Sequence, residues 1–196
     1  MGVDGSIEPI DESKLARCAN GDEMEGVKFP KDTLAYKFQS NPENLSENEM
    51  REAIVAAFRV WTSVTTIGFL EVSRGEEADV TFDFSTITQT DDGMGPKVVQ
   101  TINSGNGKII VFNSDTKWIN ATPEENSTKT FDLRFAALHA IGHELGFDHS
   151  PYSRSVMYPI FLQKRSSLNY EQRDLDEFDV ENAKKFYGSM YETVEE

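Results

Sequence analysis

One long stretch of the chain repeats apolar residues at the spacing of an α-helix. The residues that would share one face of this helix are Met50, Ile54, Ala57, Phe58 and Trp61. Ser46 stands just before the stretch and Glu49 follows three residues later, which is the pattern of a capping box at a helix start. The sequence therefore predicts an amphipathic helix over residues 47–63.

Shorter apolar stretches, some of them alternating with polar residues, predict the strands. We expect these strands at residues 33–38, 69–72, 79–84, 98–102 and 108–112. Two further helices are expected at residues 131–145 and 176–187, the second with Asp176 as its N-cap. Strands that come early in the chain with helices interspersed indicate an α+β fold, with one twisted, mixed, five-stranded sheet and three helices.

The segments between these elements are polar or irregular. Residues 91–96 carry two glycines and predict a tight loop, and residues 114–129 predict a surface loop. Residues 154–163 show no regular pattern. Residues 1–26 are rich in Gly, Asp and Glu and also lack periodicity, so we interpret them as a tail or a pro-segment in front of one folded domain.

Length, charge and cysteine content narrow the functional classes. The chain has 196 residues, enough for one domain with a substantial core. Its 34 acidic and 19 basic residues give a net charge of −15, which disfavours binding to nucleic acid or to an anionic membrane. We find no apolar run long enough to span a bilayer and no signal peptide. The single cysteine, Cys18, excludes an internal disulfide.

The most specific chemical signal is a group of histidines. The chain has three of them, His139, His143 and His149, at positions i, i+4 and i+10. The first two would lie on one face of a helix and could bind the same ion. Gly146 lets the chain leave the helix and bring the third to the same point. Three imidazoles with a fourth position open indicate a catalytic zinc site rather than a closed structural one.

Three further stretches accompany the histidines. They are residues 29–65, which hold the first predicted strand and helix, residues 107–118, and Ser155–Pro159 with Met157 inside it. With these stretches the chain resembles the matrix metalloproteinases, the matrixin branch of the metzincin zinc endopeptidases, over residues 28–188. The resemblance implies a metzincin-type catalytic domain with one catalytic zinc in the cleft. It also implies that Met157 lies in a Met-turn beneath the metal.

The same resemblance divides the chain and places it outside the cell. It implies a latency peptide over residues 1–26, a catalytic domain over residues 27–190 and a tail over residues 191–196. We expect a secreted monomer whose leader is absent from this sequence. Its partners would be protein or peptide substrates bound in extended form, and not nucleic acid or a membrane.

Position 140 departs from the family pattern. In matrix metalloproteinases a Glu directly after the first histidine is the general base, whereas this chain has Ala140. Loss of a positioned base costs roughly 10²–10⁴-fold in rate, so we expect this chain to be inactive. Glu144 lies one helical turn further along and should point to one side of the site.

Two interpretations of Ala140 stay open. One is a deliberate Glu→Ala replacement made to silence a peptidase, which we favour because every other part of the machinery is present. The other is a natural pseudoprotease that contains zinc and binds peptides without cutting them. Restoring Glu at position 140 distinguishes the two.

The segment around Cys18 is similar to the cysteine-switch motif of the family, in which a thiolate fills the open position on zinc. Arg17 precedes the cysteine and Asp22 follows it at the fourth position, as in that motif, but the glycine and proline that the motif has between them are absent. The resemblance implies that Cys18 is the inhibitory ligand and that Arg17 and Asp22 hold the loop. Some bacterial relatives use an aspartate instead, so Asp11 and Asp22 remain alternatives.

The family's other metal sites lack their ligands here. The positions of the structural-zinc ligands fall on Ser85, Ile87, Gln100 and Val111, which are poor zinc ligands in this setting. The positions of the calcium-binding acids fall on Asn113 and Thr116. We therefore expect no structural zinc and no calcium at the family sites.

The resemblance also implies where the substrate binds. Phe135 should point toward the depth of a specificity pocket beside the metal, with Pro159 and Phe161 in its outer wall. We expect residues 108–112 to form the upper strand of the cleft and to pair with an extended peptide through main-chain hydrogen bonds.

Overall fold

The computed structural model describes residues 16–18, 28–89, 95–105, 107–120, 130–161 and 174–188. Its strands are β1 (Ala16–Cys18), β2 (Thr33–Phe38), β3 (Gly68–Glu71), β4 (Val80–Ser85), β5 (Lys97–Ser104), β6 (Gly107–Asn113), β7 (Lys117–Ile119), β8 (Thr130–Asp132) and β9 (Ile160–Phe161). Its helices are α1 (Glu47–Thr62), α2 (Leu133–Glu144) and α3 (Glu177–Tyr187). The fold belongs to the α+β class, as predicted.

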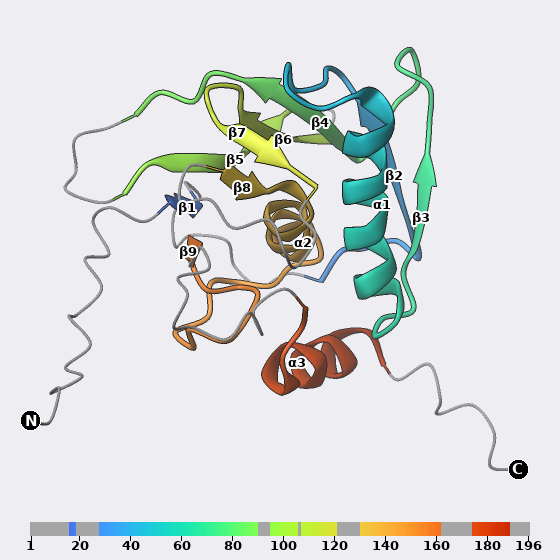
Figure 1. The fold of residues 1–196 in the computed structure, drawn as a ribbon. Coiled ribbons are helices and arrows are strands. Elements are labelled where there is room, and N and C mark those ends of the chain that lie inside the picture. The colour runs from blue at the N-terminus through green and yellow to red at the C-terminus, as the bar shows by residue number, and fades with distance from the viewer. Residues whose placement is uncertain are drawn as a thin grey trace, which may run out of the picture.

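The main sheet has the strand order β3-β2-β4-β6-β5-β1-β9, and β7 and β8 form a separate pair. The four neighbouring strands β3, β2, β4 and β6 run parallel to one another, whereas β5 runs antiparallel to β6. Figure 1 shows α1 and α2 side by side, with α3 below them. The five predicted strands are all present, and the short strands β1 and β9 extend the sheet beyond β5.

The helix starts follow the predicted capping chemistry. The Ser46 side chain accepts a hydrogen bond from the Glu49 backbone, and the Glu49 carboxylate accepts one from the Ser46 backbone. Asp176 and Asp179 make the same reciprocal pair at the start of α3. Each arrangement satisfies backbone N–H groups that have no partner within the helix. The predicted apolar face of α1 is buried over its whole length.

Two segments predicted to be irregular contain short strands. The range 114–129 includes β7, where Trp118 is fully buried and donates its indole N–H to the Asn113 carbonyl at 2.9 Å. The range 154–163 includes β9, which pairs with β1. Elements of two or three residues are too short to show a periodicity, and their stability comes from partners distant in the sequence. Residues 91–94, 121–129 and 162–163 lie outside the described part of the chain.

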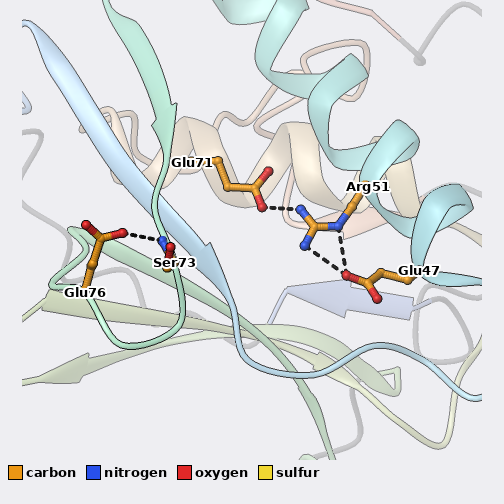
Figure 2. Close-up of polar contacts among 5 residues, drawn as sticks. All are labelled: Glu47, Arg51, Glu71, Ser73 and Glu76. Carbon is orange, nitrogen blue, oxygen red and sulfur yellow. Dashed lines mark hydrogen bonds and ion pairs between the residues drawn. The ribbon is translucent and has the colours of Figure 1, made fainter.

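Charged residues connect α1 to β3, the edge strand on the far side of the sheet from β9 (Figure 2). Arg51 binds the carboxylates of Glu47 and Glu71, and its guanidinium lies 4.6 Å from the centre of the Phe38 ring. The neighbouring loop is closed by the Glu76 carboxylate, which accepts a hydrogen bond from the Ser73 backbone at 2.7 Å. Exposed pairs of this kind contribute about 0–1 kcal/mol each.

Among the described residues, no helix combines the length and the apolarity that crossing a membrane would require.

Candidate metal centre

Helix α2 and the turn after it bring the three histidines together. The Nε2 atoms of His139 and His143, one helical turn apart, are separated by 3.0 Å, and those of His143 and His149 by 3.2 Å. Gly146 ends the helix with φ 93°, in the left-handed region that favours glycine. Its N–H bonds to the His143 carbonyl at 3.0 Å, so the chain turns back toward the helix before it reaches His149.

Backbone carbonyls orient two of the rings. The Nδ1 atom of His139 lies 2.7 Å from the Val156 carbonyl oxygen, and that of His143 lies 2.9 Å from the Phe147 carbonyl oxygen. A carbonyl can only accept, so each Nδ1 carries the proton and each Nε2 presents a lone pair. Burial, together with the charge of His149, lowers the pKa of His143 to about 3, and burial lowers the pKa of His139 as well. Both rings are therefore neutral, as metal ligands must be.

Cys18 completes a group of four possible ligands. Its side chain is 3% exposed, and its Sγ lies 3.8 Å from the Nε2 of His143. One donor atom from each of Cys18, His139, His143 and His149 falls within 4.8 Å of the others. The structure thus brings Cys18, from near the N-terminus, to the three histidines; its role as an inhibitory ligand stays a prediction. Asp11 and Asp22 lie outside the described residues.

Main-chain pairing holds Cys18 in this place. Strand β1 runs parallel to β5 and antiparallel to β9, between the two. The Cys18 N–H donates to the Pro159 carbonyl at 3.0 Å, and the Arg17 N–H donates to the Pro96 carbonyl at 2.9 Å. The Arg17 guanidinium Nε also donates to the Gly95 carbonyl at 3.0 Å. Figure 1 shows β1 and β9 together at the sheet edge near α2.

The donor set fits a tetrahedral zinc ion. Zinc bonds of 2.0–2.1 Å to nitrogen and about 2.3 Å to sulfur imply N–N separations of about 3.3 Å and N–S separations of about 3.6 Å. The observed separations of 3.0, 3.2 and 3.8 Å lie within a few tenths of an ångström of these values. The unprotonated Nε2 atoms of His139 and His143 repel each other at 3.0 Å, and a cation between them would remove that repulsion.

Ala140, at the position of the family's general base, and Glu144, one helical turn further along, both lie on α2 and are buried. Ala140, next to His139, is 1% exposed and offers no titratable group. Glu144 is 5% exposed, and its Oε2 lies 3.2 Å from Nζ of Lys108 on β6. Burial raises the pKa of Glu144, and the nearby Lys108 ammonium opposes that rise. The Glu144 carboxylate is thus directed to the sheet, off to one side as the sequence predicts.

Met157 packs against α2, the helix that carries His139 and His143. It is 3% exposed, and its sulfur lies so close to Gly142 of α2 that a Cβ added there would clash with it. One residue that holds the turn around Met157 was missed in the sequence. Asp179 of α3 accepts hydrogen bonds from the Ser155 hydroxyl at 2.5 Å and from the Val156 backbone at 2.8 Å. The spacing of Asp176 and Asp179 in the sequence indicates a helix cap. It does not indicate that the Asp179 carboxylate also binds the turn at Ser155 and Val156.

Gly142→Ala is expected to destabilise the protein by about 2 kcal/mol. The new methyl would clash with the Met157 sulfur and would lie 2.9 Å from Cζ2 of Trp61. The methionine could shift, but the indole is fixed by its 2.8 Å bond to the Leu138 carbonyl and by stacking on Phe147. Overpacking therefore outweighs the higher helix propensity of alanine, about 1 kcal/mol. Urea unfolding tests this, with Gly75→Ala, which meets nothing within 4 Å, as the control.

The prediction for the upper strand of the cleft was wrong. Residues 108–112 belong to β6, which lies inside the sheet between β4 and β5. The strand beside β1 is β5, with Cys18 opposite Val99. Strands β5 and β6 form an antiparallel hairpin, and both contain apolar residues. The sequence pattern therefore did not distinguish the inner strand, β6, from β5.

The residues assigned to the specificity pocket lie next to the histidines. The ring of Phe161 packs edge-on against His139, with centroids 5.0 Å apart, and against Phe135 at 5.8 Å. Pro159 supplies the carbonyl that binds the Cys18 backbone. Their role as pocket walls stays a prediction. The same is true of the missing structural zinc, although Ile87 and Val111 at two of its ligand positions are buried apolar side chains.

A histidine-bearing helix beside a mixed sheet, a third histidine after a glycine turn and a methionine packed against that helix are typical of metzincin-type metallopeptidases. Within that class the chain belongs to the matrixin family, because the family model described as Matrixin matches residues 28–188. Matrixins are zinc-dependent endopeptidases, which supports the interpretation of the Cys–His group as a zinc site.

Individual relatives agree with this assignment. The chain is 32% identical to matrix metalloproteinase-C of Caenorhabditis elegans over 170 residues, which are 83% of this chain and 29% of that protein. It is 32% identical to metalloendoproteinase 1 of Glycine max over 161 residues, 79% of this chain and 50% of that protein. It is 29% identical to stromelysin-2 of Rattus norvegicus over 168 residues, 83% of this chain and 33% of that protein. The chain thus spans half or less of the length of these relatives.

Proposed function

We propose that this chain is a zinc-dependent endopeptidase in a latent form, with zinc held by His139, His143 and His149 and closed off by Cys18. The observation that carries the proposal is the convergence of three imidazole Nε2 atoms and one thiol sulfur on a common point. Zinc bound there would lower the pKa of a coordinated water to about 7 and polarise a peptide carbonyl.

The pairing of β1 supports the latent form. A strand between β5 and β9 uses main-chain groups on both sides, such as the Pro96 and Pro159 carbonyls, that an extended peptide substrate could otherwise use. Any peptide that pairs with β5 along this edge must first displace residues 16–18. Latency would then have two causes: the thiol closes the metal, and its strand fills the adjacent edge of the sheet.

A second candidate function is a peptide-binding pseudoprotease that contains zinc. Ala140 is the observation that favours it, because the residue directly after His139 has no carboxylate to take a proton. Glu144 does not replace it, since its carboxylate is paired with Lys108. We retain the endopeptidase as the first candidate and regard Ala140 as a deliberate replacement of the base; a natural replacement would instead favour the pseudoprotease.

The setting of this activity is part of the proposal. Substrates would be proteins or peptides bound in extended form beside β5, and the protein would act as a monomer outside the cell. The net charge of −15 supports a partner other than nucleic acid or an anionic membrane. We also propose that no second, structural zinc is bound.

Elemental analysis and cobalt spectroscopy test the metal centre. We expect about one zinc per chain in the purified protein and almost none in His143→Ala, which lacks the central ligand. Cobalt substituted for zinc should show a thiolate-to-metal charge-transfer band that disappears in Cys18→Ser while the metal content stays the same. A protein that binds no zinc would overturn the proposal, and two zinc ions per chain would contradict the expected absence of a structural site.

A further inference from the structure

An ion pair with a buried carboxylate stands next to one of the histidines and has no part in the proposed zinc ligation. Glu144 follows His143 at the end of α2, and its side chain is 3% exposed. Its Oε2 lies 3.2 Å from Nζ of Lys108, which is 31% exposed and stands at the start of β6. The pair therefore joins the metal helix to the sheet at the position of the central ligand.

The pair stands next to that ligand. Glu144 directly follows His143 in the chain, and the Lys108 ammonium lies 3.2 Å from the Glu144 carboxylate. A positive charge in this place disfavours a metal cation bound to His143, and at the buried end of α2 the charge is screened less than it would be in water. Removal of Glu144 would leave the Lys108 charge without its partner at this position.

We propose that Glu144 is a positioning residue that neutralises Lys108 beside His143 and so keeps the zinc affinity of the centre high. Lys108 in turn fixes the end of α2 to β6. The pair acts through charge on a ligand and touches neither the metal nor a substrate. The inference rests on the proposed binding of zinc by the three histidines.

The proposal is tested by the zinc affinity of two single variants, in which the expected changes differ. Zinc affinity is measured by competition with a chromophoric chelator, on the full chain, after circular dichroism has confirmed the fold. Glu144→Gln leaves Lys108 uncompensated and should weaken zinc binding by about 10- to 100-fold, the usual range for residues that support a metal ligand. Lys108→Met removes the opposing charge and should bind zinc at least as tightly as the unchanged protein. The double variant should return to within about threefold of it.

If the ion pair only held α2 against β6, the variants would show a different pattern of zinc affinity. In that case Glu144→Gln, Lys108→Met and the double variant would all weaken zinc binding, because each would loosen α2 from β6, and the charge role would be refuted. Lys108→Arg provides a second measurement that keeps the charge; it should leave the affinity unchanged, and a large loss would count against the proposal.

The exposed pair of Arg51 and Glu71 serves as the matched control. It also joins a helix to the sheet, but at the β3 edge (Figure 2). Glu71→Gln and Arg51→Met change the net charge by the same steps and should leave zinc affinity unchanged. Equal shifts in the control and test variants would refute the charge role at His143. If the unchanged protein binds no zinc, the proposed function fails; if it binds zinc and all variants match it, only the role of the pair fails.

Discussion

Ala140→Glu, combined with Cys18→Ala, is expected to raise the rate of peptide cleavage by about 10²–10⁴-fold over Cys18→Ala alone. The glutamate would stand next to His139 at the position where matrixins carry their general base. Cys18→Ala is needed as well, because the Sγ atom lies 3.8 Å from the Nε2 of His143 and closes the metal in the proposed latent form. The assay follows a quenched peptide with an apolar residue after the scissile bond, and a chelator should abolish the cleavage.

Ala140→Gln in the same Cys18→Ala background is the matched control. It has the size of glutamate but cannot accept the proton, so its rate should stay near that of Cys18→Ala alone. Position 140 is 1% exposed, so both variants are also checked for their zinc content and their folding. An Ala140→Glu variant that is folded and contains zinc but does not cleave would contradict the endopeptidase and favour the peptide-binding alternative.

The local parts of this centre could be predicted from the sequence because short-range geometry determines them. The i, i+4 spacing of His139 and His143 fixes their common face, and Gly146 supplies the turn with φ 93°. The capping boxes at Ser46 and Asp176 have the same local origin. In each case the interacting residues are separated by only a few positions in the chain.

The long-range parts could not be predicted in this way. The Asp179 carboxylate reaches the Met-turn from a different helix, and no local pattern links the two segments. The order of β5 and β6 in the sheet was assigned wrongly because both strands of the hairpin are rich in apolar residues. The pairing of Lys108 with Glu144 depends on that same order, so no pattern in the chain connects the two residues.

Removal of the metal is expected to destabilise the protein strongly. The Nε2 atoms of His139 and His143 face each other at 3.0 Å, and in the neutral rings neither carries a proton because both Nδ1 atoms donate to carbonyls. Without a cation these two buried lone pairs repel each other, and zinc affinity adds directly to the stability of the folded state. With free zinc about 1,000-fold above its Kd, the contribution is about 4 kcal/mol, or roughly 8–16 °C in Tm for a domain of this size.

Thermal unfolding with zinc and with a strong chelator measures this contribution. His143→Ala is the control: having lost the central ligand, it should unfold at the same temperature in both solutions. Cys18→Ser should keep part of the zinc dependence, because three imidazoles remain while the thiol that holds β1 at the metal is gone. Equal unfolding temperatures of the unchanged protein with and without zinc would show that the histidines converge for packing alone. The large dependence expected here requires that the same three side chains hold an ion.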